Sequence, residues 1–123
     1  MSTTVFIEKE RCDHVRAVND SGSDVVQYEF AIIGPYAAVA DEAIASLATG
    51  SFHVEEGIQI QTDDLESGYD TFATPGQPVY WNGTNFQDTA VAEDYFVGYL
   101  LEVKDSTGKI VFEKVRYAEE VPS

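Results

Sequence analysis

Short runs of β-branched and aromatic residues, each ended by a turn signal, recur along this chain and limit the folds open to it. Residues 25–33 form the clearest run, and Gly34-Pro35 ends it. Asn82-Gly83 is a tight-turn signal of the same kind. About seven or eight such runs, with turn signals roughly every eight to twelve residues, are typical of an all-β fold. The sequence therefore predicts a single small β-barrel or β-sandwich domain.

Individual strands can be placed from the same pattern. We expect strands over residues 15–18, 25–33, 36–40, 79–81, 95–103 and 109–117. A further strand is expected over residues 52–61, with a bulge at Glu56-Gly57. Its polar residues, among them His53, are expected on a solvent-exposed face. Residues 41–50 have the Asp cap and the final Gly of a two-turn helix, although isolated helices of that length are marginal.

The chain divides into one domain and two short flanking segments. A length of 123 residues suits one domain whose core is large enough to fold without disulfides or metal ions. The single cysteine, Cys12, excludes an intramolecular disulfide. We assign residues 1–14 to an extended, flexible N-terminal arm, 15–117 to the β-domain and 118–123 to a C-terminal tail. Neither a secretory signal nor a membrane-spanning run is recognisable, so we expect a protein made in a cytoplasm.

Acidic residues dominate the middle of the chain. The formal net charge is −15, and all seven Lys and Arg residues lie outside residues 17–103. A body of this charge repels phosphate groups, which argues against nucleic acid and anionic membranes as partners. We therefore expect contact with another protein, at the less negative ends of the chain. Adaptation of a whole proteome to high salt is an alternative explanation of the acidity.

No group of residues has the spacing of a catalytic or metal centre. Cys12, Asp13 and His14 are neighbours in an extended segment, where side chains alternate between faces, so adjacency does not make a nucleophile and its base. Two histidines and one cysteine without ligand spacing argue against a zinc site. The acidic run over 63–70 lacks the ligand positions of an EF-hand and predicts a solvated loop. We expect no enzyme activity, no cofactor and no metal.

The aromatic residues around Trp81 have two interpretations. With Tyr80, Tyr95 and Tyr99, Trp81 can form an exposed platform for a ligand or the core of a small β-domain and its polar rim. The core is the commoner arrangement, and we favour it. A small acidic module that binds a carbohydrate or calcium through Trp81 and the 63–70 loop stays an alternative.

Two short sequence motifs resemble those of a known protein family. Residues 76–82 read Gly-Gln-Pro-Val-Tyr-Trp-Asn, and residues 97–102 read Val-Gly-Tyr-Leu-Leu-Glu. This order resembles the capsid decoration, or cement, proteins of tailed phages, whose signature is a G-x-x-V-Y-W turn and strand, a variable loop and V-G-x-x-L-E. The motif positions are Gly76, Pro78, Val79, Tyr80, Trp81, Val97, Gly98 and Leu100.

The resemblance covers about residues 15–117, because residues 37–40, Gly50 and 54–57 are also compatible with the family pattern. It implies an irregular turn over 41–47 in place of a helix. The chain departs from the family in two acidic loops, over 63–70 and 87–94, and in a longer N-terminal arm.

The resemblance implies a structural role. Proteins of this family bind the exterior of the expanded capsid and bridge its major capsid protein subunits, typically as homotrimers at local three-fold positions. The implied location is the outer surface of the virion head, and the motif residues would serve the core and the oligomer contacts. A tail-tube or head–tail joining subunit is an alternative, because such proteins also assemble through β-edges.

The N-terminal arm is the expected capsid contact if the resemblance holds. Val5, Phe6 and Ile7 form a short apolar cluster suited to adding a strand to an exposed capsid edge. Beside it, basic side chains would reach capsid carboxylates. Those residues are Lys9, Arg11 and Arg16.

Overall fold

Antiparallel strands make up the regular secondary structure of this computed structural model, which describes residues 3–6 and 14–123. No helix occurs among those residues, so none there is long and apolar enough to cross a membrane. The all-β prediction is confirmed, with ten strands in the described residues. They are β1 (Thr3–Phe6), β2 (His14–Val18), β3 (Phe30–Ile33), β4 (Tyr36–Ala40), β5 (Thr49–His53), β6 (Gln59–Thr62), β7 (Pro78–Trp81), β8 (Phe86–Gln87), β9 (Tyr95–Glu102) and β10 (Ile110–Glu120).

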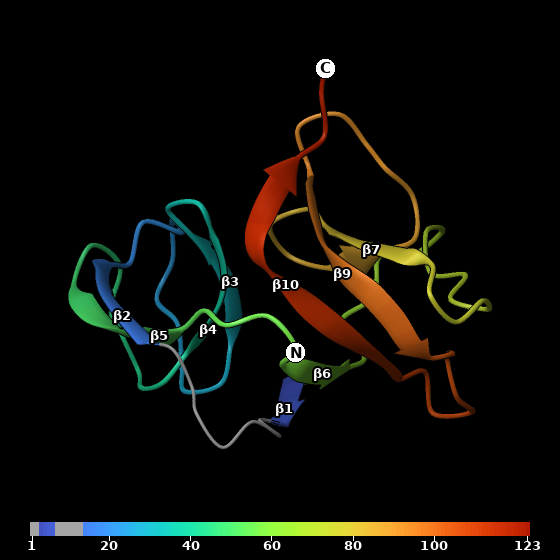
Figure 1. The fold of residues 1–123 in the computed structure, drawn as a ribbon, viewed down its shortest axis with the longest axis horizontal. Helices are drawn as coiled ribbons and strands as arrows, with labels where there is room; N and C mark the ends of the chain where they lie inside the picture. The colour runs from blue at the N-terminus through green and yellow to red at the C-terminus, as the bar shows by residue number, and fades with distance from the viewer. Residues whose placement is uncertain (1–2, 7–13) are drawn as a thin grey trace.

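The strands form two lobes, which lie side by side in Figure 1. The small lobe has the order β2-β5-β4-β3, and the large lobe has the order β1-β6-β10-β9-β7-β8. β10 joins them, since Tyr117 pairs with Tyr36 of β4. The strand pairing does not close into a barrel. On the side away from β7, β8 bonds to the segment after β6 and not to another strand: Phe86 N donates to Asp64 O and Glu66 N donates to Phe86 O, both at 2.8 Å.

The β3–β4 hairpin is a wall that both lobes share. Phe30, Ala37 and Val39 belong to the core of the large lobe, whereas Ala38 and Ala40 belong to the core of the small lobe. Both faces of the hairpin are therefore buried. This burial explains why residues 30–40 read as an almost continuous apolar run instead of an alternating one.

Three segments differ from expectations or decide between them. Of the strand expected over 25–33, only Phe30–Ile33 is a strand (β3), because the chain turns before it at Tyr28, which has a φ of +67°. The single bulged strand expected over 52–61 is two strands, β5 and β6, because Gly57 turns the chain between them with a φ of +92°. Residues 41–48 form an irregular turn, as the resemblance implied, and not the helix that propensity suggested. The expectation that His53 is exposed is wrong: its side chain is 6% exposed, because it faces Asp41 and the ring of His14.

The hairpin expected near the C-terminal end is confirmed as β9 and β10. Asp105 holds its turn, because the carboxylate accepts hydrogen bonds from Thr107 Oγ1 at 2.7 Å, Thr107 N at 2.9 Å and Lys109 N at 3.0 Å. These bonds, led by the Thr107 hydroxyl, stabilise the charged form and lower the pKa of Asp105 from its ordinary value. The turn thereby fixes the register of the hairpin that carries the second motif segment.

Candidate functional site

The two motif segments lie side by side as neighbouring strands of the large lobe. In the register of β7 and β9, Val79 pairs with Gly98. The turn before β7 is tied to β9 as well, because Gly76 N donates to Leu100 O at 2.7 Å. The sequence motif is therefore one continuous patch of antiparallel sheet.

One side of this patch builds the core of the large lobe. Its buried motif side chains are Val79, Trp81, Val97 and Leu100. The ring of Trp81 packs against Phe86 and Phe30, with centroid separations of 4.6 Å and 5.1 Å. Because Trp81 is enclosed by this packing, it does not present a flat ring to a ligand.

The backbone requires two glycines of the motif. Gly76 has a φ of +88°, a region that residues with a side chain rarely adopt. At Gly98, β9 lies so close to β10 that a Cβ atom would collide with the carbonyl oxygen of Glu113 and approach the ring of Phe112 to 2.8 Å. The two strands can therefore lie this close together only because residue 98 is a glycine.

The other side of the patch is apolar but faces solvent. We call it the outer β7–β9 face, and it consists of Pro78, Tyr80, Phe96, Tyr99 and Leu101. Tyr99 and Leu101 are 51% and 39% exposed. The ring of Phe96 packs edge-on against Tyr80 and Tyr99, with centroids 6.0 Å and 5.1 Å away. An ordered apolar surface that remains exposed is typical of a site that binds another protein.

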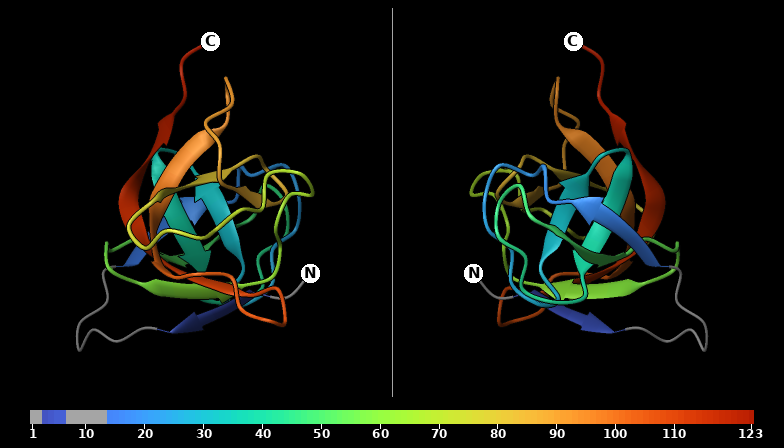
Figure 2. Two further views of the ribbon diagram at one scale, coloured as in Figure 1. Left: turned by 90° about the vertical axis from the view of Figure 1, so that its right-hand side faces the viewer. Right: turned by 90° about the vertical axis from the view of Figure 1, so that its left-hand side faces the viewer.

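The N-terminal segment contributes an edge strand to the large lobe. β1 pairs with β6, with Val5 opposite Ile60 and Phe6 opposite Gln59, and Figure 2 shows it along that edge. Among the described residues β1 pairs on one side only, so its other edge can accept a further strand. Arg16 lies exposed in β2. The other residues assigned to the arm contact lie outside the described residues: Ile7, Lys9 and Arg11.

One basic residue near the C-terminal end is unavailable to a partner. Lys114 is 1% exposed, and its Nζ donates to the carbonyl oxygens of Val54, Glu55 and Val115 at 3.1, 2.9 and 2.9 Å. It follows Phe112 on the inward side of β10, and this alternation is the sequence signal that predicts its burial. The ammonium group ties β10 to the turn between β5 and β6.

The carboxylates of the 63–70 loop have separate partners. Asp70 Oδ2 lies 3.2 Å from Lys104 Nζ, whereas Glu66 Oε1 accepts a hydrogen bond from Asn82 Nδ2 at 2.6 Å. The loop therefore directs its charges to different neighbours. In the part of the chain that the structure describes, one group of His, Cys, Asp or Glu side chains comes close enough to hold a metal ion, and it lies in the small lobe.

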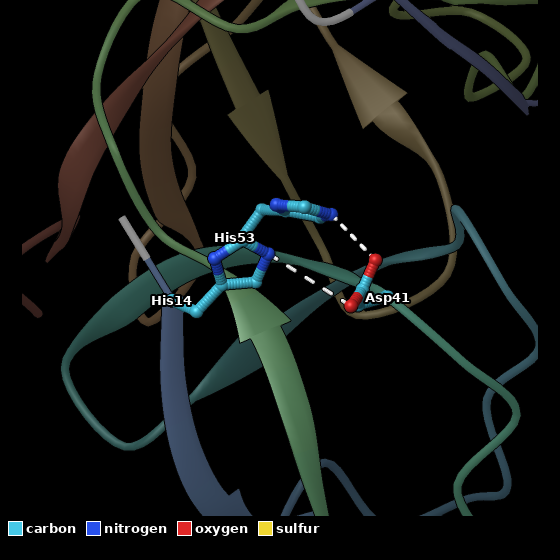
Figure 3. Close-up of side chains that lie close together, drawn as sticks. All are labelled: His14, Asp41 and His53. Carbon is cyan, nitrogen blue, oxygen red and sulfur yellow. Dashed lines mark hydrogen bonds and ion pairs between the residues drawn. The ribbon is translucent and has the colours of Figure 1, made fainter. Parts of the chain in front are cut away.

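That group consists of His14, Asp41 and His53 (Figure 3). His14 of β2 lies opposite His53 of β5, and Asp41 directly follows β4. Asp41 Oδ1 is 2.8 Å from His53 Nε2, and Asp41 Oδ2 is 3.8 Å from His14 Nε2. Sequence reasoning missed this group because its members are far apart in the chain and only the strand register brings them together.

A comparison with known families bears on the motif patch. A family model described as phage cement protein matches residues 9–116, a range that includes all eight motif positions. Searches of curated proteins and of solved structures found no match. The family is one of structural proteins of the phage capsid. With a match over most of its length, including the strands β7 and β9 that carry the motif, the chain belongs to the phage cement protein family.

Proposed function

We propose that this protein binds the outer surface of the expanded capsid of a tailed phage and bridges neighbouring major capsid subunits. The family match carries the proposal, because it spans nearly the whole folded body. Packaged DNA pushes the shell outward, and a ligand that binds only the expanded lattice stabilises that lattice at every occupied site. The protein would thereby hold the shell against the pressure of the DNA.

The outer β7–β9 face supports self-association as a trimer on the capsid. Tyr99 and Leu101 leave apolar area in water, and the aromatic contacts of Phe96 hold that area in a fixed shape. A fixed apolar surface loses little conformational entropy when a second copy covers it. Three copies related by a three-fold axis can each use this face in a closed ring.

The N-terminal segment supports direct contact with the capsid. β1 already has strand geometry at an edge of the large lobe, so a capsid strand that pairs with its other side would extend the sheet. Backbone hydrogen bonds would supply the affinity of this contact. The pairing with β6 would orient the segment before the capsid binds.

The charge distribution supports a fixed orientation on the shell. The acidic residues lie mainly within 17–103, and all seven Lys and Arg residues lie in the flanks. The acidic body facing solvent would repel DNA and discourage aggregation of free protein. The capsid contact would then use the less negative flanks.

Rebinding to capsids tests the proposal. Expanded heads that lack this protein would be mixed with the purified chain, and the bound copies counted after co-sedimentation. We expect saturation at a multiple of the three-fold positions of the shell. Binding confined to one vertex would instead indicate a head–tail joining subunit, and no binding would refute a capsid role for the chain alone.

Two variants separate the two contacts. Removal of residues 1–10 should abolish binding, and because it also removes β1 from its pairing with β6, circular dichroism checks that the remaining β-domain stays folded. The double variant Tyr99→Ser/Leu101→Ser should weaken binding by disrupting the trimer. Val26→Ser is the matched control, because Val26 is an exposed apolar residue of the small lobe. Equal binding by all three variants would remove both contacts from the proposal.

A further inference from the structure

We propose that His14, Asp41 and His53 form a binding site for a transition-metal dication of the zinc class. Imidazole nitrogen and carboxylate oxygen are ligands that Zn²⁺ takes in proteins, and three protein ligands with one water complete a tetrahedral shell. The chain has two histidines in all. Both place Nε2 toward the same carboxylate, each next to a different oxygen (Figure 3).

The donor atoms are close to the spacing that a bound ion requires. With metal–ligand bonds of 2.0–2.2 Å, the donors of a tetrahedral site lie about 3.3 Å apart. Here the two nitrogen–oxygen separations are 2.8 Å for His53 and 3.8 Å for His14, and the ligand atoms all lie within 4.8 Å of one another. Because the two separations involve different oxygens of Asp41, an ion would be held either by one of these oxygens or by both.

The site is fixed on its inner side and open on its outer side. The ring of His53 is buried, including its Nδ1 atom, and this burial holds Nε2 toward Asp41. The side chains of His14 and Asp41 are 42% and 39% exposed, so an ion can enter from solvent and keep a water ligand. The negative charge of the protein also raises the local concentration of cations.

The ligand set selects the class of ion and indicates what binding would do. Two imidazole nitrogens suit Zn²⁺ and its transition-metal neighbours, whereas Ca²⁺ and Mg²⁺ prefer shells of oxygen. A bound ion would link β2 to β5 and to the residue that follows β4. Because the unfolded chain does not hold these three residues together, the ion would stabilise the folded small lobe.

Titration of ZnCl₂ into the full chain, followed by calorimetry, tests the site. A Cys12→Ser background removes the thiol as a competing ligand. His14→Ala and Asp41→Asn each remove one ligand from a partly exposed position, and Asp63→Asn makes the same charge change as Asp41→Asn on an exposed carboxylate elsewhere. We expect one Zn²⁺ per chain, with an affinity at least about 10-fold lower in the two ligand variants and unchanged in Asp63→Asn.

Nitrogen NMR of the imidazole rings distinguishes binding at the two histidines from general binding to acidic groups, because acidic groups do not change the imidazole nitrogen signals. Zn²⁺ should shift the Nε2 signals of both histidines and raise the unfolding temperature, and CaCl₂ should do neither. Circular dichroism checks that the variants are folded. The proposal is overturned if Zn²⁺ binds His14→Ala as tightly as Asp63→Asn, if the Nε2 signals stay in place, or if Ca²⁺ binds as tightly as Zn²⁺.

Discussion

The two lobes share a wall but are stabilised in different ways. Rings dominate the core of the large lobe, where Phe86 contacts Phe30, Trp81 and Phe112 at centroid distances of 4.6–5.2 Å. The core of the small lobe contains one aromatic residue, Phe52, among alanine, valine and isoleucine. Aromatic side chains bury the largest areas per residue. The small lobe must therefore obtain more of its stability from other interactions.

Buried polar groups supply part of that stability in the small lobe. Asn19 is fully buried, and its Nδ2 donates to the carbonyl oxygens of Ser23 and Ile44 at 2.8 Å and 3.0 Å. Its Oδ1 accepts a hydrogen bond from the hydroxyl of Ser21 at 2.7 Å. The cluster around Asp41 belongs to the same lobe. In the small lobe, hydrogen bonds from buried polar groups therefore add to a core with fewer aromatic contacts than the core of the large lobe.

Phenylalanine removal is the largest expected perturbation of either lobe. Phe86→Ala and Phe52→Ala should each lower the free energy of unfolding by about 3–5 kcal/mol. Phe86→Ala should be the more destabilising, because it also removes three aromatic contacts worth about 0.5–1.5 kcal/mol each. Urea unfolding monitored by circular dichroism measures both values.

The same experiment tests whether the shared β3–β4 wall couples the lobes. Trp81 is the single tryptophan and lies in the large core, so its fluorescence reports that lobe. With coupling, Phe52→Ala should shift the fluorescence midpoint as far as the circular dichroism midpoint. A fluorescence midpoint that does not move would mean that the lobes unfold independently.

Replacement of glycine by alanine should lower the unfolding free energy by less than the loss of a phenylalanine, and by different amounts in the two lobes. A Cβ at Gly98 in the large lobe would meet the backbone oxygen of Glu113, whereas a Cβ at Gly50 in the small lobe would meet only the side chain of Ile44. A buried, β-branched side chain such as Ile44 can shift only in part, but a paired strand backbone yields less still. Gly98→Ala should therefore cost about 1–3 kcal/mol of unfolding free energy, and Gly50→Ala less. Equal losses in thermal unfolding would contradict this account of the β9–β10 contact.

Local sequence patterns predicted strands in both lobes best where turn residues bound them, as at Tyr36–Ala40 after Gly34-Pro35. The β9–β10 hairpin and the β7 strand before Asn82-Gly83 follow from period-two alternation and from turn residues a few positions away. The pairing of β1 with β6 joins segments far apart in the chain, and β8 is only two residues long, so no local pattern indicates either of them. The prediction of one strand over 52–61 was wrong at Gly57, because a break in the alternation is compatible with a turn as well as with a bulge.

The sequence also indicated some features of the candidate sites better than others. The resemblance to the cement proteins indicated the motif positions around Trp81 and Gly98, and the register of β7 and β9 brings them together in one patch. The burial of His53 was not predicted, because it depends on His14 and Asp41, which the strand pairing brings beside it from other parts of the chain. Alternation along β10 places Lys114 on the inward side, but it does not identify the three backbone carbonyl oxygens that satisfy the buried ammonium group.

Backbone strain in the turns gives the smallest expected difference between the lobes. Ile44 and Leu65 each form an isolated bridge, and the third residue after each has a positive φ: +68° at Leu47 in the small lobe and +85° at Gly68 after β6. A left-handed conformation costs a residue with a side chain about 1–2 kcal/mol, and glycine avoids this cost. Glycine instead loses about 0.5–1 kcal/mol more chain entropy on folding, which offsets part of the gain. Leu47 is 76% exposed, so its side chain contributes little packing. Leu47→Gly should therefore raise the unfolding free energy by about 0.5–1 kcal/mol.

The reciprocal change, Gly68→Ala, is the matched control and should lower stability, because space around its Cβ is open and strain alone acts there. Thermal unfolding of both variants measures the two effects against the parent chain. If Leu47→Gly destabilises the protein, the leucine side chain must make a stabilising contact that outweighs the strain of its backbone. Opposite signs for the two variants would show that a shared turn geometry, and not the core beneath it, sets the residue preference at these positions.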